Sequence, residues 1–219
     1  MSRYFYFKEE KMGEKAFTLI ELLIVVAIIA ILAAIAVPNF LEAQVRSKVS
    51  RSKADMRTID TALNSYMVDT NKVPIDGSAD GDGVPFWYIP WILTTPVSYI
   101  TTANLTDPFR DVAFYEPSSP GTDEQDLTVA DWRRYRYRNF EYTYGEEKAA
   151  LYELSYGAYE IMGNGPDKGA GPFKYFTYEG LRLELTQPYD PTNGTVSPGN
   201  LIRSQKFPDG RQFYPGEPE

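Results

Sequence analysis

The sequence predicts an α+β protein in which a long N-terminal helix packs on a small antiparallel β-sheet. Three patterns carry this prediction. An apolar run from Phe17 to Val37 favours a helix. Apolar residues then recur at spacings of about three, four and seven up to Asp69, which favours an amphipathic continuation. Residues 133–138 alternate between Arg and Tyr, as expected for a strand with two different faces.

The apolar run is long enough to cross a membrane. As a helix it would extend roughly 31 Å, about the thickness of a bilayer's hydrocarbon core. Only Thr18 and Glu21 interrupt it, and a carboxylate at such a position is costly unless it has a partner. A secretory signal has a shorter apolar region followed by small residues at a cleavage site. We therefore expect Glu21 to be functional, with a cationic amine as the partner that offsets its burial.

Residues 16–21 (AFTLIE) resemble the cleavage and methylation motif of type IV pilins and type II secretion pseudopilins, and Pro38 stands at that family's helix-kink position. The resemblance implies that residues 1–16 are a leader, removed by a prepilin peptidase that cuts between Ala16 and Phe17. The peptidase then methylates the new amino group of Phe17. The family usually has Gly where this chain has Ala16, a departure that bears on the efficiency of processing.

The resemblance also implies a location and a set of partners. Basic residues flank the apolar run on both sides, so the positive-inside rule does not decide the orientation. The family places the leader in the cytoplasm, residues 17–37 in the inner membrane, and the globular region, residues 71–206, in the periplasm or extracytoplasmic space. The implied partners are other copies of the chain in a helical homopolymer, the prepilin peptidase, minor pseudopilins, the inner-membrane assembly platform, and membrane lipid before assembly.

Composition excludes several kinds of active site. The 219 residues include no His and no Cys, which rules out a Ser-His-Asp or Cys-His centre and thiolate metal ligands. The net charge is −8, and most of the excess acid lies in the globular region. Nucleic acid is not an expected partner, because phosphate binding requires clustered Lys and Arg. We expect no enzymatic activity.

Beyond the apolar run, residues 38–70 are predicted to form the amphipathic half of the same helix. Pro38 should bend the helix without ending it. The apolar stripe, expected to pack beneath the sheet, consists of Phe40, Leu41, Val45, Val49, Met56, Ile59, Leu63, Tyr66 and Met67. The charged residues expected mostly on the other faces are Arg46, Lys48, Arg51, Lys53 and Asp60.

The globular region is predicted to begin irregularly and then form strands. Residues 76–83 (DGSADGDG) do not satisfy the EF-hand pattern and are predicted to form a flexible turn. An aromatic, Pro-rich stretch at 84–100 is predicted to be a packed connection. Residues 133–144 are predicted to form a strand whose Tyr face covers the helix and whose Arg face is in solvent; single-stranded nucleic acid binding is the less favoured interpretation.

Two further segments complete the predicted globular region. Residues 171–187 are predicted to form a hairpin inserted before the final loop. Residues 207–219 are rich in Pro and Gly and are predicted to be a flexible tail.

Two short segments of the globular region resemble major pseudopilins. Residues 105–109 (LTDPF) resemble an Asp-Pro-aromatic turn, and residues 158–167 (AYEIMGNGPD) resemble a strand and loop that hold a calcium ion. Asp167 takes the matching acidic position, and Asp190 follows only after the inserted hairpin. The resemblance implies a calcium ion held by Asp167, Asp190 and backbone carbonyls. The alternative is two ordinary turns.

These observations lead to one favoured function and three alternatives. The chain resembles most closely the major (G-type) pseudopilin of type II secretion systems, which implies a structural subunit of a periplasmic filament that helps to export proteins. A type IV pilus subunit for adhesion, motility or DNA uptake is the first alternative, although such pilins often close a C-terminal loop with a disulfide. The others are a membrane-anchored calcium-binding module and a membrane-anchored hydrolase with a carboxylate pair, for which no acidic pair stands out.

Overall fold

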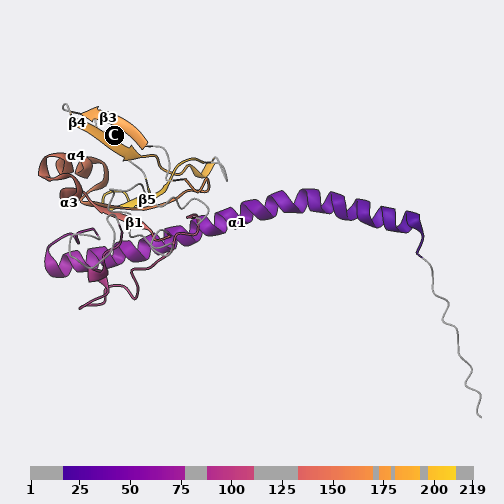
Figure 1. Ribbon diagram of the computed structural model, residues 1–219, viewed down its shortest axis with the longest axis horizontal. Coiled ribbons are helices and arrows are strands. Elements are labelled where there is room, and N and C mark those ends of the chain that lie inside the picture. Colours follow the sequence, from indigo (N-terminus) through magenta and orange to yellow (C-terminus); the bar gives the residue numbers. More distant parts are fainter. Residues whose placement is uncertain are drawn as a thin grey trace, which may run out of the picture. The chain divides into compact units, whose positions relative to one another are not determined.

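The computed structural model describes residues 17–76, 88–110, 133–169, 173–178, 181–192 and 197–210 (Figure 1), with the side chains of 173–178 and 181–184 left out of the description. The chain divides into two compact units, Met1–Leu41 and Glu42–Glu219. We call residues 17–41 the apolar segment and the described residues from 42 to 210 the head unit. Each is described by itself.

Helix α1 runs from Leu19 to Thr70 and contributes to both units. This confirms the long helix predicted from about Phe17 to Asp69. The helix passes through Pro38 without ending. It stops where Asn71 adopts a left-handed conformation, with φ of 54°, and donates its backbone N–H to the Met67 carbonyl at 2.9 Å. This is an αL cap, a conformation that Asn tolerates better than most residues.

The large apolar side chains of the apolar segment are exposed along its whole length. Phe17 is 71% exposed and Leu19 81% exposed. An 18-residue window here has a mean hydropathy of 3.1, and none of it is buried within the chain. By length and composition this part of α1 is able to cross a membrane. A core helix of a soluble protein would instead bury such side chains against its own fold.

The part of α1 in the head unit carries the predicted stripe into a hydrophobic core. Val49, Met56, Ile59 and Leu63 are buried there, and Val45, Tyr66 and Met67 pack at its margin. Phe40 and Leu41 are exposed members of the apolar segment, so the packed stripe begins at Val45. The prediction for Asp60 was wrong, because this carboxylate is buried against the sheet, where it has polar partners that the sequence pattern does not reveal.

The sheet above this helix is antiparallel, with strand order β1-β2-β5. Strand β1 is Arg136–Asn139, β2 is Tyr159–Gly163, and β5 is Leu201–Ser204. Tyr137 of β1 pairs with Ile161 of β2, which pairs with Arg203 of β5. The predicted hairpin is confirmed as β3 (Phe173–Tyr178) and β4 (Leu181–Thr186).

The predicted strand at 133–144 is wrong in its second half. Asn139 ends β1, and its side chain accepts a hydrogen bond from the backbone N–H of Tyr142, capping helix α3 (Phe140–Tyr144). Gly145, at φ of 75°, then separates α3 from α4 (Glu146–Tyr156). Phe140 and Tyr144, four residues apart, stack on each other with ring centroids at 6.4 Å. Spacing typical of a helix was therefore mistaken for strand alternation.

Helices α3 and α4 cover the face of the sheet opposite to α1 (Figure 1). A second apolar cluster forms there, in which Phe140 stacks on Tyr152 and Tyr156, with Leu185 and Ile202 beside them. Leu201 packs into the core on α1, whereas Ile202 packs into this second cluster. Successive side chains of β5 therefore pack on opposite faces of the sheet, as the pleat of a strand requires.

The prediction that the Arg face of β1 lies in solvent was also wrong. Arg134 is buried, donates to the Ile89 carbonyl at 2.7 Å, and lies over the rings of Tyr88 and Trp91. Arg138 is buried beside Glu160, at 3.5 Å, and donates to the Tyr144 hydroxyl at 2.8 Å. Carbonyl, carboxylate and aromatic partners compensate for the loss of water around these guanidinium groups. Neither Arg134 nor Arg138 therefore offers an exposed cation to a nucleic acid.

Segments predicted to be irregular are ordered where the structure describes them. The connection contains the short 3₁₀ helix η2 (Trp91–Leu93). Asp76 is buried and accepts a hydrogen bond from the Thr143 hydroxyl at 2.8 Å, so the predicted flexible turn is wrong at this residue. Residues 77–83 lie outside the described residues.

The predicted flexible tail begins with a turn that packs against β5. Residues 207–210 form this turn, in which Phe207 donates its backbone N–H to Ser204 Oγ at 3.1 Å. The flexible-tail prediction is therefore wrong for these residues. Residues 211–219, the remainder of the predicted tail, lie outside the described residues.

Candidate assembly site

A reciprocal hydrogen-bonded cap starts helix α1. The backbone N–H and the hydroxyl of Thr18 both donate to Glu21 Oε2, at 2.9 and 2.7 Å. The backbone N–H of Glu21 is 3.3 Å from the Thr18 hydroxyl oxygen and donates to it. This arrangement is a capping box, with Thr18 at the N-cap and Glu21 at the third helical position. It satisfies backbone N–H groups that the first helical turn would leave without partners.

The capping box gives Glu21 a local partner that the sequence analysis missed. The Thr-x-x-Glu pattern before an apolar run was the available signal. The cap involves only Thr18 and Glu21, so a cut before Phe17 would leave every one of its donors in place. Among the described residues, the Glu21 hydrogen bonds all go to Oε2. The second carboxylate oxygen therefore remains available to an incoming donor.

The structure places three of the four predicted processing and assembly residues on one segment. Phe17 is exposed directly before the cap, Glu21 lies in the first turn of α1, and Pro38 lies inside the helix. Ala16, on the other side of the expected cut, lies outside the described residues. Together the described residues form a capped, apolar and uncovered helix with one carboxylate at its start.

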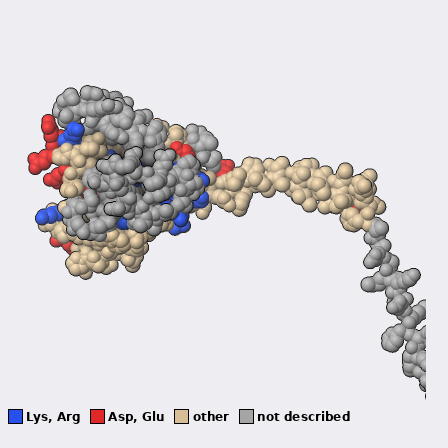
Figure 2. All heavy atoms as spheres, in the orientation of Figure 1, with Lys and Arg blue, Asp and Glu red and all other residues tan. Residues whose placement is uncertain are grey.

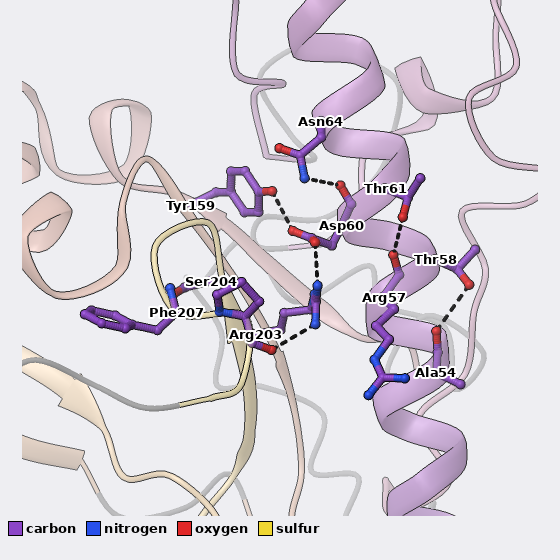
Figure 3. Close-up of polar contacts among 11 residues, drawn as sticks. Ala54, Arg57, Thr58, Asp60, Thr61, Asn64, Tyr159, Arg203, Ser204 and Phe207 are labelled. Carbon is purple, nitrogen blue, oxygen red and sulfur yellow. Dashed lines mark hydrogen bonds and ion pairs between the residues drawn. The ribbon is translucent and has the colours of Figure 1, made fainter.

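A second polar site fixes α1 to the sheet within the head unit (Figure 3). Asp60 Oδ1 accepts the Tyr159 hydroxyl at 2.7 Å, and Asp60 Oδ2 lies 2.8 Å from Arg203 Nη2. Arg203 Nη1 also donates to the Pro208 carbonyl at 2.8 Å. Burial and the bond to Asp60 raise the pKa of Tyr159, which keeps it a donor. We call Asp60, Tyr159 and Arg203 the clamp; it joins α1, β2, β5 and the turn at 207–210.

A buried carboxylate connects the two segments that resemble pseudopilins. Asp107 Oδ1 accepts the backbone N–H of Phe109 at 2.9 Å, and Oδ2 accepts that of Asn164 at 2.6 Å. Burial raises the pKa of Asp107, although both hydrogen bonds favour its charged form. The Asp-Pro-aromatic turn therefore holds the start of the loop that ends at Asp167.

Asp167 and Asp190, the residues predicted to bind calcium, each close a local turn. Asp167 Oδ1 accepts the backbone N–H of Gly169 at 3.3 Å. Asp190 Oδ1 accepts the N–H and the hydroxyl of Thr192 at 2.8 and 2.7 Å, and these bonds lower its pKa. Within the described part of the chain, no three or more acidic, His or Cys side chains gather as a metal-binding group.

The loops that carry these two aspartates nevertheless approach each other through glycines. A Cβ on Gly165 would lie 2.0 Å from the Gly199 carbonyl oxygen, and a Cβ on Gly199 would lie 2.0 Å from that of Pro188. Only glycine permits such close backbone approach. The carbonyls of Gly199 and Pro188 are thus held against the backbone of Gly165 and Gly199 respectively, which brings the loops that carry Asp167 and Asp190 together.

Comparison with known proteins bears on the capped, apolar start of the chain. Residues 11–37 match the family model described as the prokaryotic N-terminal methylation motif. The chain is 52% identical over 58 residues to the type IV major pilin protein PilA of Myxococcus xanthus, covering 26% of each chain. It is 49% identical over 59 residues to the type IV major fimbrial protein FimA of Dichelobacter nodosus, covering 27% of this chain and 37% of that protein.

A secretion-system protein is also among the relatives. The type II secretion system core protein G of Pseudomonas aeruginosa is 37% identical over 65 residues, which is 30% of this chain and 46% of that protein. The chain thus spans less than half the length of each of these three relatives. No solved structure matches the chain.

The motif match, the exposed apolar helix and the small antiparallel sheet are consistent with a pilin-like fold. The chain carries the N-terminal methylation motif, and 58 to 65 of its residues align with type IV pilins and with a type II secretion protein G. None of the three relatives is named as an enzyme, which fits the expectation of a non-enzyme.

Proposed function

We propose that the chain is a structural subunit of a helical filament, and specifically of a type II secretion pseudopilus that helps to export proteins. One observation carries the proposal: an apolar segment with no cover of its own begins at a capped carboxylate, Glu21. Such a surface needs either lipid or further copies of itself around it. Membrane insertion first surrounds the segment with lipid, and polymerisation then surrounds it with further copies of itself.

When the apolar segment moves from lipid into a filament core, Glu21 contributes much of the driving force. Lipid tails are as apolar as the side chains of the segment, so moving from lipid into a filament core gains little from the hydrophobic effect. Close packing and polar pairing must then supply most of the driving force. A cut between Ala16 and Phe17 creates an amine beside the cap, and methylation retains its charge. In the filament, the free oxygen of Glu21 accepts that amine from a neighbour as a charge-assisted hydrogen bond.

Processing and orientation follow from the same proposal. Prepilin peptidase removes residues 1–16 on the cytoplasmic side of the inner membrane, and the head unit lies outside the cytoplasm. Minor pseudopilins and the inner-membrane assembly platform receive the processed subunit. Mass spectrometry of assembled protein tests the first step: the mature chain should begin at N-methylated Phe17. Filaments built from chains that retain residues 1–16 would contradict it.

A type IV pilus subunit is the second candidate, supported by the 52% identity to a type IV pilin over 58 residues. The absence of Cys favours a pseudopilin, since pilins often carry a C-terminal disulfide. Deleting the gene separates the two. Loss of protein export with surface filaments intact supports the pseudopilus, and loss of surface filaments with export intact supports the pilus.

We also propose that calcium binds between the Asp167 and Asp190 turns. The support is the donor chemistry, since two carboxylates and backbone carbonyls are the oxygen ligands that calcium prefers, and the loops carrying the two aspartates approach each other at Gly165 and Gly199. Binding to the folded state alone would stabilise it, by about 2.7 kcal/mol at a calcium concentration 100 times Kd. Chelator-treated protein should melt higher after calcium addition, and Asp167→Ala should lose that increase. Unchanged melting of the unsubstituted protein would leave both aspartates as turn residues.

A further inference from the structure

The head unit carries a small cationic pocket beside the middle of its helix. Lys53 and Arg57 of α1 line a cavity of about 150 Å³ together with Arg203 of β5 and Asp209. Arg203 is held by Asp60 in the clamp. Within the described part of the chain, the side chains of Lys53 and Arg57 make no hydrogen bond or ion pair. We call this site the cationic pocket.

An acidic groove lies at the C-terminal end of the same helix. It has a volume of about 590 Å³ and lies between the end of α1, at Asn71 and Lys72, and the starts of α3 and α4, at Glu141 and Glu146. Both glutamates are exposed, and among the described residues neither side chain has a hydrogen-bond or ion-pair partner. In Figure 2 the acidic side chains gather over α3 and α4.

Three basic side chains earlier on the head unit's helix have local partners. Arg46 pairs with Glu42, and Arg51 lies 3.7 Å from Asp55. Lys48 lies over the ring of Phe109. Local ion pairing therefore offsets the charges of Arg46 and Arg51. The two sites thus hold a cation pair, Lys53 and Arg57, halfway along this helix, and a carboxylate pair, Glu141 and Glu146, beside the single base Lys72 at its C-terminal end.

The two sites are separated along the helix axis by a distance that parallel subunits can bridge. Fourteen positions separate Arg57 from Asn71, or roughly 21 Å at the helical rise per residue. In a filament whose helices run parallel, a neighbour shifted by about this distance brings its cationic pocket to the acidic groove. The contact is heterologous, so it repeats along a filament without closing on itself.

We propose that the cationic pocket of one subunit binds the acidic groove of the next copy of this chain, with Lys53 and Arg57 facing Glu141 and Glu146. The inference rests on the proposed filament function and adds to it a head-to-head contact that sets the axial register. Exposed ion pairs contribute modestly to affinity, whereas like charges placed opposite each other are strongly unfavourable. The contact therefore selects one register and disfavours others.

A charge swap in the full-length chain tests the pairing. Arg57→Glu and Glu146→Arg should each reduce filament yield roughly tenfold, because each places like charges opposite each other, and the double variant should restore it. The melting temperature of each purified single variant controls for folding. Yields unchanged in both single variants, or a double variant as defective as the singles, would overturn the proposed contact. Failure of the unsubstituted chain to form filaments would instead overturn the proposed function.

Disulfide cross-linking gives an independent readout, since the chain has no Cys of its own. Filaments carrying Arg57→Cys and Glu146→Cys together should form intermolecular cross-links on mild oxidation. The matched control replaces Glu146→Cys with Lys148→Cys, an exposed position about 200° around α4, and should form few. Equal cross-linking in both pairs, or none in the first pair, would contradict the proposed register.

Discussion

The apolar segment and the head unit share one helix, but its apolar side chains are exposed in the first and buried in the second. In the apolar segment the large apolar side chains face outward, and the polar chemistry is confined to the cap formed by Thr18 and Glu21. In the head unit the helix buries Val49, Ile59 and Leu63 and also carries a buried carboxylate, Asp60. The first region depends on its surroundings for stability, whereas the second is stabilised by its own core.

This difference separates assembly from folding. A change in the apolar segment should alter insertion or polymerisation and leave the melting of the head unit unchanged. A change in the head unit's core should alter melting and affect assembly only through loss of the fold. The following variants test that separation.

The largest expected effect is that of Glu21→Ala on assembly. The variant removes both the cap acceptor and the proposed partner of a neighbour's amine, and leaves an unpaired amine in an apolar filament core. We expect filament yield to fall to background. The melting temperature of the head unit should not change, because Glu21 makes no contact there. Filament yield by electron microscopy and melting by circular dichroism give the two readouts.

Glu21→Gln distinguishes the two roles of the carboxylate. Glutamine still accepts hydrogen bonds from Thr18 and so keeps the cap, but it carries no charge for the amine. Assembly as poor as in Glu21→Ala would assign the effect to the charge pair. Normal assembly of Glu21→Gln would show that only the cap matters and would refute the pairing argument.

The two regions also differ in how far the sequence predicts them. The helix, its passage through Pro38 and the exposed apolar segment follow from hydropathy and periodicity. The Thr-x-x-Glu cap was equally readable but was overlooked, because Glu21 was considered only as a membrane carboxylate. The comparisons support this region directly, because the family model of the N-terminal methylation motif matches residues 11–37.

The head unit was less predictable because its buried polar groups find partners far away in sequence. The pairing of Asp60 with Arg203 joins α1 to β5, and that of Arg138 with Glu160 joins neighbouring strands. A periodic pattern assigns charged residues to the surface and does not identify such partners. A related limit applies to α3, whose rings of Phe140 and Tyr144 repeat at helical spacing directly after an Arg-Tyr sequence that has strand alternation.

The second largest effect is expected from Asp60→Ala, which breaks the clamp. The substitution leaves Arg203, whose side chain is 17% exposed, without its carboxylate and Tyr159 without its acceptor. Breaking a buried ion pair costs about 3 kcal/mol or more, discounted here for partial exposure to about 2–3 kcal/mol. Denaturant unfolding of the head unit should show this loss. Thr61→Ala, at the adjacent exposed position of the same helix, is the control and should change stability little.

Asp60→Ala also tests whether the apolar segment and the head unit behave independently. Membrane insertion depends on the apolar segment alone, so the variant should insert normally while its head unit unfolds more easily. Protease digestion of membrane fractions would show this as faster loss of the head unit with an intact membrane-bound remnant. A defect in insertion itself would show that the two regions are not independent.

The smallest effects concern pH and have opposite signs at two carboxylates. Burial raises the pKa of Asp76 from its ordinary value of 3.8, against hydrogen bonds from Thr143 and Asn139 that favour the charged form. The folded state therefore holds the proton more tightly than the unfolded chain. The contribution of Asp76 to stability is fully present below pH 3.8 and is lost as pH rises through the raised pKa. Asp76→Asn should remove this loss and flatten the decline in stability toward neutral pH.

Asp190→Asn is the matched variant, and its effect on the pH dependence of stability should have the opposite sign. Thr192 lowers the pKa of Asp190 through two hydrogen bonds, so its contribution is present above pH 3.8 and is lost as pH falls through the lowered pKa. Asp190→Asn should therefore reduce stability at neutral pH more than at acidic pH. Urea unfolding from pH 3 to 7, with chelator present to exclude metal binding, measures both slopes. Slopes that change in the same direction would contradict the assignment of burial to Asp76 and hydrogen bonding to Asp190.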